Sequence, residues 1–509
     1  MIAHQTERGN ALPLASLITL TTLTSQLVDY VHQAARDGTP VHVVERGIWN
    51  QILALGHKAL GLFFQEQGTG DMGEQIQLPD GSTVARLDAP HTRDYRSVFG
   101  DFALTRTCYG TREGQKIEFV PLDNRLELPE GNYSYLLQEW DAAIGTDSAF
   151  ARVAATFQNI LGIKQSVDSL ERNNLHMAAS VEPFRESRPI PAPEDEGEVF
   201  VVSADGKGIV LRRDPTDPAP KAHRNKGDKA NKKRMAIVGA VYSVDRYQRT
   251  PEEVTAALFR DPRSPEKPIP PRPIPVGKHV WGRLSRAKDG SIGEPIKTVF
   301  SWLGAELGRR QGPEKKEVVC VMDGQQALWD GRAEHLDVEV VEILDILHVT
   351  PRLWQAAHLF CAEKSAEAAE FVRERLLKVL RGEVKAVVQR LRWLGTNLGL
   401  TGAKKKTLVT ICNYLKSNAD RMRYDEYLKK GYPIASGVIE GACRHYVKDR
   451  MERAGMRWVK AGAQAMLDVR SEYINGDWDK FQQFRIERET NRLYPHRKAV
   501  HEVEWQLAT

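Results

Sequence analysis

Hydrophobic and polar positions alternate at helical spacing over residues 16–65, and this pattern predicts two amphipathic helices. Residues 95–127 differ, because apolar runs rich in β-branched and aromatic residues flank the polar segment at 111–115. Such runs predict a hairpin or a small sheet. Helical spacing returns over residues 136–180. The first third of the chain is therefore expected to be a mixed α/β region.

A pair of short helices within this region has the spacing of a helix-turn-helix. The first should run from Ala149 to Leu161 and end at Gly162, and the second from about Lys164 to Asn173. The second helix of such a motif can enter the major groove of DNA, but a plain helical hairpin fits the sequence equally well. On the first interpretation, the residues that would contact bases or phosphates are Gln165, Ser166, Ser169 and Arg172.

The middle of the chain begins with a Pro- and Glu-rich segment at 187–198, which predicts a linker and a domain boundary. Residues 199–211 and 235–247 are then apolar and β-branched, as in buried strands. Residues 262–276 contain seven prolines, so this segment is expected to be extended.

In the C-terminal half, segments with helical spacing alternate with short apolar segments typical of strands. A helix is predicted at about 295–310, followed by two short buried strands at 317–322 and 337–346. Residues 350–430 are nearly all helical apart from glycine-containing breaks, and a last helical region covers about 436–475. Strands separated by helices are typical of an α/β fold.

Composition excludes several classes of protein. Among the 509 residues, no segment approaches the roughly 20 consecutive apolar residues of a membrane helix. The first residues lack a basic segment followed by a long apolar one, so no signal peptide is expected. The five cysteines form no CxxC pair, which argues against a zinc-finger array and against a disulfide scaffold. A reducing, cytoplasmic location without membrane contact is expected.

Positive charge is concentrated in two places, although the whole chain carries only +5. Residues 404–460 contain 14 Lys and Arg against 6 Asp and Glu, a surplus of +8. Residues 221–234 contain seven Lys and Arg and one Asp. Clustered cations give sequence-independent affinity for a phosphate backbone. The alternative is a solvated loop and a solvated helical face.

Three acidic residues are candidate metal ligands. Asp205 ends the apolar run VFVVSAD, Asp323 ends EVVCVMD, and Glu440 follows Ser436, a candidate helix cap. Aspartates at the ends of buried strands meet ligands at the open edge of a sheet. Three carboxylates together suit Mg²⁺ or Mn²⁺, and two such ions support phosphodiester chemistry. Taken singly, an Asp-Gly pair is usually a turn, and a helical Glu is usually surface charge.

Further residues near these acids fit the same chemistry. Asp345 and His348 form an Asp-x-x-His at a strand end, where His348 would orient a phosphate or a metal-bound water. Alternatively, His348 caps the next helix and Asp345 is a structural hydrogen-bond acceptor. Glu440, Arg444 and Lys448 are neighbours at i,i+4 spacing, and cations beside a catalytic acid suit a phosphate substrate. Cations also follow in the next turns, at Arg453 and Arg457.

Several of these segments resemble one family. The segments VVSADGKG at 201–208, VCVMDGQQALW at 319–329, LDILHVTPRLWQAA at 344–357 and SGVIEGACRHYVKDRMERAGMRW at 436–458 are similar to motifs of bacterial ISKra-type insertion-sequence transposases. PLDNRLELPEGNYS at 121–134 is similar to their N-terminal region. The resemblance covers roughly residues 90–475.

The resemblance implies a DDE transposase with an RNase H-like catalytic core. It assigns Asp205, Asp323 and Glu440 as the three acids that bind two Mg²⁺ or Mn²⁺ ions, with His348 as a further catalytic residue. It implies cleavage of DNA at transposon ends and joining of the 3′-OH to target DNA, by a dimer or larger assembly in the bacterial nucleoid. The DNA-binding residues expected on this basis and on charge are Gln165, Ser169, Arg172, Arg444, Lys448, Arg453 and Arg457.

The expected organisation is an α/β, RNase H-like catalytic core with an all-α insertion, preceded by a mixed α/β DNA-binding region. The segments are an N-terminal helical region at 1–90, a β-rich and helix-turn-helix-like region at 91–190, the first part of the core at 196–350, the insertion at 351–430, the final core helices at 431–475 and a tail at 476–509. A nuclease or resolvase on the same scaffold and a domesticated DNA-binding regulator are the alternatives. A small-molecule metal hydrolase is more distant, because no phosphate-cradling glycine loop is present.

Overall fold

The chain divides into two compact units, Met1–Phe184 with Trp478–Thr509, and Arg185–Asp477. The computed structural model describes residues 12–111, 117–212, 233–262, 271–285, 291–453, 455–497 and 500. Most of the basic cluster at 221–234 and much of the proline-rich segment at 262–276 lie outside these described residues.

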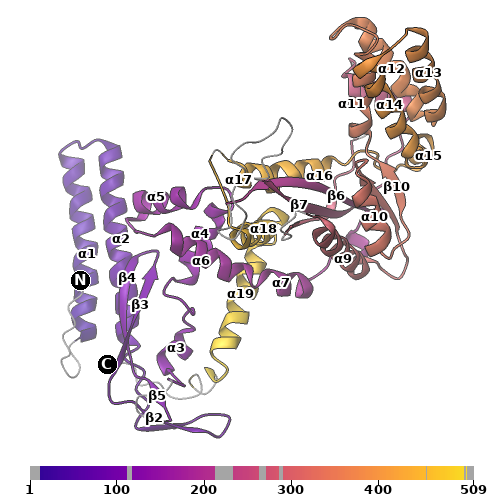
Figure 1. Ribbon diagram of the computed structural model, residues 1–509. Helices are drawn as coiled ribbons and strands as arrows, with labels where there is room; N and C mark the ends of the chain where they lie inside the picture. Colours follow the sequence, from indigo (N-terminus) through magenta and orange to yellow (C-terminus); the bar gives the residue numbers. More distant parts are fainter. Residues whose placement is uncertain are drawn as a thin grey trace, which may run out of the picture. The chain divides into compact units, whose positions relative to one another are not determined.

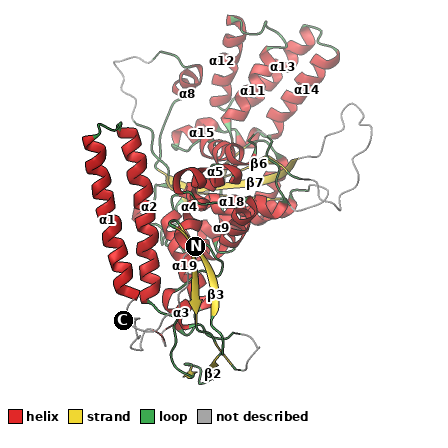
Figure 2. Cartoon of the chain, turned by 90° about the vertical axis from the view of Figure 1, so that its left-hand side faces the viewer, coloured by secondary structure: helices red, strands yellow, loops and turns green. Residues whose placement is uncertain are grey.

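The first unit begins with an antiparallel pair of long helices, α1 (Leu12–Arg36) and α2 (Val41–Glu66) (Figure 2). The prediction of two helices here is confirmed. The helices approach closely at Gly47, where an added Cβ would lie 2.0 Å from the hydroxyl oxygen of Tyr30. A side chain at this position would therefore force the helices apart.

Two small sheets follow in the same unit. Strands β3 (His91–Ser97) and β4 (Gly100–Arg106) form an antiparallel hairpin, which confirms the β prediction for this segment. The prediction of a strand is wrong for Pro121–Leu126, which form helix α3. Proline at the first helical position favours a helix start, and this signal outweighs the apolar alternation. The second sheet consists of β1 (Gln75–Gln77), β2 (Thr83–Arg86) and β5 (Tyr109–Gly110).

The remaining helices of this unit include the predicted helical pair. Helix α5 (Phe150–Leu161) ends at Gly162, whose φ of 74° is in the left-handed region that favours glycine. Helix α6 begins at Val167, three residues after the predicted Lys164, because the Ser166 hydroxyl caps it by accepting a hydrogen bond from the Ser169 amide. The other bounds are α4 (Tyr135–Gly145), α6 (Val167–Ala178), α7 (Val181–Ser187) and α19 (Trp478–Leu493).

A five-stranded mixed sheet forms the centre of the second unit, in the order β10-β9-β6-β7-β8 (Figure 1). Strand β6 pairs antiparallel with β7, which pairs antiparallel with β8, whereas β9 and β10 run parallel to β6. The predicted strands at 199–211, 235–247 and 317–322 are confirmed. The strand predicted at 337–346 covers fewer residues. The bounds are β6 (Val199–Val210), β7 (Lys233–Val244), β8 (Val276–Leu284), β9 (Glu317–Met322) and β10 (Val341–Leu344).

Two hydrophobic clusters pack on opposite faces of this sheet, as the alternation of side chains along β6 requires. Phe200 and Val202 pack with the apolar residues of α9 (Gly293–Arg310) and α10 (Gln326–His335). Val199 and Val201 pack with α11 and with the helices that follow it. Both faces of the central strands are therefore buried, as is usual for strands with helices on either side.

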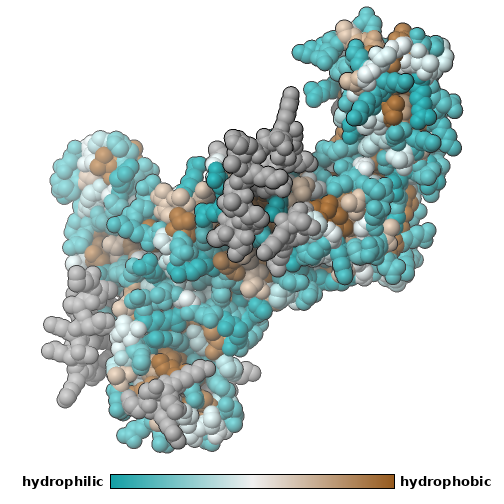
Figure 3. All heavy atoms as spheres, viewed as in Figure 1, coloured by the Kyte–Doolittle hydropathy of each residue, from teal (hydrophilic) through white to brown (hydrophobic). Residues whose placement is uncertain are grey.

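A bundle of helices, residues 346–429, follows β10 and is called here the helical region. In the face drawn in Figure 3, hydrophilic residues cover most of the surface around α12 and α13. Many of its apolar residues point inward into the cluster that also covers the sheet, although a few such as Trp393 are exposed. The bounds are α11 (Ile346–Ala357), α12 (Ala366–Leu380), α13 (Val384–Asn397), α14 (Gly402–Ser417) and α15 (Tyr424–Lys429).

The last helices of the second unit return to the sheet, where α16 contacts β6 and β7, and α18 contacts β8. A π-helical turn, Cys443–Lys448, separates α16 from α17. The bounds are α8 (Pro251–Phe259), α16 (Gly437–Ala442), α17 (Asp449–Met451) and α18 (Lys460–Asn475). Among the described residues, no helix combines the length and the apolar character needed to cross a membrane.

Candidate functional site

Strand register brings three aspartates to one level of the mixed sheet. Val202 of β6 pairs with Cys320 of β9, so a step of three residues along each strand reaches Asp205 and Asp323. Leu344 of β10 pairs with Met322, so one further residue reaches Asp345 and Asp323. Because β6, β9 and β10 run parallel, the three aspartates lie side by side at the level where β9 and β10 end.

Asp205 lies within β6 rather than at its end, which corrects the sequence prediction. The strand continues to Val210 because it pairs with β7 along its full length, with Asp205 opposite Val238. The Asp205-Gly206 pair is therefore not a turn, and the carboxylate accepts a hydrogen bond from the Gly206 amide at 2.6 Å. By the two-residue period, Asp205 faces the same side of the sheet as Val201.

Asp323 directly follows β9, as predicted, and accepts a hydrogen bond from the Gln325 amide at 2.9 Å. Burial raises the pKa of Asp323, and the nearby carboxylates of Asp205 and Asp345 raise it further. Mutual repulsion of this kind shows that the three carboxyl groups are close enough to interact electrostatically. A divalent cation placed among them would relieve it.

Asp345 is fully buried and organises two segments around the site. Its carboxylate caps α11 by accepting a hydrogen bond from the Leu347 amide at 2.8 Å. It also accepts hydrogen bonds from the amide and hydroxyl of Ser436, at the start of α16. Asp345 is therefore a structural hydrogen-bond acceptor, as one of the two predicted alternatives had it. The cap of α11 is Asp345 and not His348, the residue expected there on that alternative.

His348 and Glu440 complete a cluster with Asp345. One ligand atom from each of these residues lies within 4.8 Å of the others, a spacing that could hold a metal ion. His348 Nδ1 is 3.4 Å from Asp345 Oδ2, and this contact, with help from Asp323 and Glu440, raises the pKa of the imidazole. Burial raises the pKa of Glu440, as do Asp345 and Asp205. We call Asp205, Asp323, Asp345, His348 and Glu440 the acidic site.

His348 is the one basic side chain of the acidic site as defined, and it pairs with Asp345. In the described part of the chain, no Lys or Arg forms an ion pair within 4.0 Å of Asp205, Asp323 or Glu440. Converging carboxylate oxygens without a basic partner are the donor set that hard divalent cations prefer. The residues present therefore fit Mg²⁺ or Mn²⁺ ions.

Cys443 and Tyr414 also line the acidic site, and the sequence analysis missed both. The Cys443 thiol contacts Asp205, and burial together with this carboxylate raises the pKa of the thiol. Tyr414, on α14, packs against Gly324, the residue after Asp323. Cys443 lies one turn beyond Glu440 and could have been found from helical spacing, whereas no local pattern links Tyr414 to Asp323.

The predicted cationic face beside Glu440 is altered by the π-helical turn. Arg444 and Lys448 are exposed, but the wider turn between them breaks the i,i+4 spacing assumed for the face. Arg453 and Arg457 are also exposed, and the Arg453 guanidinium donates to the Asp449 carbonyl at 2.6 Å. All four cations are therefore accessible to a phosphate backbone.

The predicted contacts of the helix-turn-helix differ in accessibility. Gln165 donates to Asp141 at 2.8 Å, and Ser169 is 8% exposed and bonded to Ser166. Both side chains are engaged in packing the helical pair, so neither is free to contact a base in this arrangement. Arg172 is 69% exposed and pairs with Asp168 at 3.1 Å.

The Asp141–Gln165 pair predicts a pH-dependent stability. Burial raises the pKa of Asp141 to about 7, above the ordinary value of 3.8. The folded state therefore binds the proton more tightly, and stability should fall as pH rises from about 4 to about 7. Asp141 Oδ2 and Gln165 Oε1 are both buried without a hydrogen-bond partner. Protonation of Asp141 would supply a donor for Gln165 Oε1.

Asp141→Asn should remove this pH dependence. The amide is neutral at every pH, so we expect the variant to be more stable than the wild type by about 4 kcal/mol at pH 8 and nearly equal at pH 4. Urea unfolding at both pH values measures the difference. The exposed Asp168→Asn is the matched control, and an unchanged profile for Asp141→Asn would contradict the prediction.

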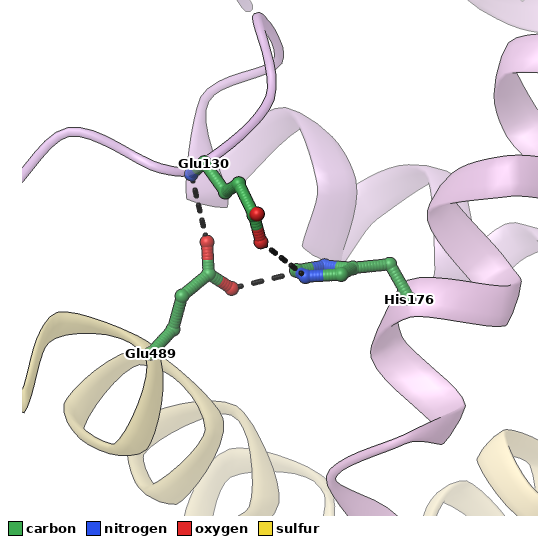
Figure 4. Close-up of side chains that lie close together, drawn as sticks. All are labelled: Glu130, His176 and Glu489. Atoms are coloured by element: carbon green, nitrogen blue, oxygen red, sulfur yellow. Dashed lines mark hydrogen bonds and ion pairs between the residues drawn. The ribbon is translucent and has the colours of Figure 1, made fainter. Parts of the chain in front are cut away.

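A second cluster of possible ligands lies in the first unit, formed by Glu130, His176 and Glu489 (Figure 4). Glu130 Oε2 is 3.3 Å from His176 Nε2, and Glu489 accepts a hydrogen bond from the Glu130 amide at 2.8 Å. However, Arg492 contacts the same oxygen of Glu130 at 2.5 Å, and this contact lowers the pKa of Glu130. Because a protein cation already balances Glu130, we interpret the cluster as an ion-pair network that joins α6 to α19.

Comparisons with known proteins identify no family for this chain. No family profile matches it, and no curated protein matches it in sequence. Among solved structures, the Drosophila P element transposase strand transfer complex aligns with 73% of this chain and 82% of that chain, at a TM-score of 0.24 and 9% sequence identity. A TM-score this low does not establish a common fold. The resemblance to ISKra-type transposases therefore stays a prediction.

Proposed function

We propose that this chain is a DDE-type DNA transposase with an RNase H-like core. The observation that supports this proposal most strongly is the strand register that places Asp205 and Asp323 side by side, with Glu440 near enough to Asp205 and Asp345 for their charges to raise its pKa. The order of the sheet also supports it, because three antiparallel strands are followed by two parallel ones on the other side of the first. The family resemblance implies Asp205 on the first strand and Asp323 on the fourth, and in this sheet Asp323 directly follows the fourth strand in chain order, β9.

The proposed mechanism assigns each residue a separate task. Asp205, Asp323 and Glu440 would hold two Mg²⁺ ions, which when bound supply an activated water or 3′-OH and stabilise the leaving oxygen. Asp345 holds α11 and Ser436, so that His348 and Glu440 stay in place. The raised pKa of His348 favours its protonated form, which suits contact with a phosphate oxygen.

The exposed cations would bind the DNA backbone around the acidic site. Arg444, Lys448, Arg453 and Arg457 lie on the segment that follows Glu440, and each accessible cation can neutralise a phosphate. We retain Arg172 as a contact of the helical pair but propose none for Gln165 or Ser169. Because two transposon ends must be joined, we expect at least two chains in the active DNA complex.

A cleavage and joining assay tests this function. The purified chain is incubated with duplex DNA that carries the sequences flanking its reading frame, with Mg²⁺, with Mn²⁺ or with a chelator. We expect metal-dependent nicking and strand transfer, both lost in Asp205→Ala while DNA binding is kept. Asp245→Ala, an exposed aspartate after β7, is the control. Nicking without joining would indicate a nuclease, and full activity of Asp205→Ala would overturn the proposal.

A further inference from the structure

Arg352 presents an unpaired cation beside the acidic site. It lies one turn after His348 on α11, so the two side chains share a face of the helix. Arg352 is exposed, and its guanidinium is 5.1 Å from the centre of the Tyr414 ring. Within the described residues it forms no ion pair, and it donates a long hydrogen bond to Gln355 at 3.5 Å.

Tyr414 places this cation next to Asp323. An added Cβ at Gly324 would lie 2.3 Å from the Tyr414 ring and 2.8 Å from its hydroxyl oxygen, so the ring lies directly over Gly324. Burial raises the pKa of Tyr414 to about 12, with a further contribution from Asp323, while Arg352 opposes the rise. The ring of Tyr414 therefore contacts Gly324, the residue after Asp323, and also contacts the Arg352 guanidinium.

Two other stacked arginines of the second unit, unlike Arg352, are paired with carboxylates. Arg373 stacks on Phe259 and pairs with Asp261, and Arg421 stacks on Trp329 and pairs with Glu342. In both cases a carboxylate balances the guanidinium. Arg352 stacks in the same manner, yet the nearby carboxylates do not pair with it.

A guanidinium fixed on an aromatic face and left without a carboxylate is suited to bind an anion from outside the protein. The anionic group that reaches the acidic site in the proposed function is the phosphate backbone of DNA. A cation on α11 would hold the strand from a different element than the segment that follows Glu440.

We propose that Arg352, held by Tyr414, binds a backbone phosphate adjacent to the phosphodiester bond at the acidic site. This inference rests on the proposed function. It makes the helical region a part of the DNA-binding surface rather than only a cover for the sheet. Arg352 is on this account a substrate-binding residue, and Tyr414 is a positioning residue.

The salt dependence of DNA binding tests the inference. Binding is measured in the Asp205→Ala background, which leaves the DNA uncut, over a range of salt concentrations. Loss of one phosphate contact should reduce the slope of log K against log salt by about 1. We expect this reduction, and about tenfold weaker binding, for Arg352→Ala. Tyr414→Leu should behave similarly, whereas Tyr414→Phe keeps the ring and should bind nearly as the wild type does.

A matched control comes from the same helical region. Arg390, on α13, stacks on the exposed Trp393 at 4.1 Å, and Arg390→Ala should leave the slope unchanged. An unchanged slope for Arg352→Ala overturns the inference. If the slope falls but the wild type never cleaves DNA, the phosphate contact stands and the proposed chemistry fails. If the wild type binds no DNA, both fail.

Discussion

Asp323→Asn should abolish metal-dependent DNA cleavage, with a loss of about a thousandfold or more. Asp323 follows β9, which lies between β6 and β10, so Asp323 has Asp205 on one side and Asp345 on the other. Asparagine keeps the shape and the capacity to accept the Gln325 hydrogen bond, but it removes the negative charge that a divalent cation requires. A thousandfold loss corresponds to about 4 kcal/mol of transition-state stabilisation, in the range expected when metal-ion catalysis is removed.

Single-turnover cleavage in Mg²⁺ measures this loss, and thermal unfolding with and without Mn²⁺ measures metal binding independently of cleavage. The variant should lose the stabilisation that Mn²⁺ gives the wild type. Asp330→Asn is the matched control, because Asp330 is exposed on α10 and bonded only to Gln326 among the described residues. A variant that cleaves at the wild-type rate would remove Asp323 from the site.

Asp205 and Asp323 could be singled out from the sequence because each comes at the end of a strongly apolar run, which is the clear signal of a buried strand. Glu440 has no such signal, because it lies on a helix, and it was chosen for its combination with the two aspartates and for the family resemblance. The structure brings Asp205 and Asp323 to one level of the sheet through the register of β6 and β9. Asp205 was wrongly expected at a strand end because the Asp-Gly pair has the chemistry of a turn, and only pairing with β7 shows that the strand continues past it.

Contacts between distant segments were not predictable in the same way. Gln165 was expected to face DNA because helical position gives no information about the Asp141 side chain that binds it. Tyr414 lies over Gly324 only because the helical region folds back onto the sheet. The π-helical turn after Glu440 likewise has no sequence signal that we recognise, and it changes which side chains follow Glu440 on the surface.

The second large effect concerns a buried ion pair that supports both aspartate-bearing strands. Arg310, at the end of α9, binds the two oxygens of Glu196 at 2.7 Å each, and both side chains have an exposure of 0%. Glu196 shortly precedes β6, and α9 leads into β9. Arg310→Ala leaves a buried carboxylate without its partner, so we expect the free energy of unfolding to fall by about 3–5 kcal/mol. Urea unfolding of the full chain measures it.

The chain contains a closely matched control for this prediction. Arg373 binds both oxygens of Asp261 at 2.7 Å each and stacks on an aromatic ring, as Arg310 does on Phe200. The Arg373 pair, however, is about one third exposed, with values of 34% and 33%. Because water screens exposed pairs, Arg373→Ala should change stability little. Equal effects of the two variants would show that lost packing, rather than the unpaired buried charge, determines the loss in free energy of unfolding.

Removal of both charges separates these two causes further. In Arg310→Met with Glu196→Leu, no carboxylate is left unpaired, and two apolar side chains fill much of the space. Such replacements of buried ion pairs are often neutral or stabilising, so the double variant should regain most of the stability lost in Arg310→Ala. If it remains as unstable as the single variant, the lost contacts of Arg310 with the Gly277 carbonyl and Phe200 would account for the effect instead.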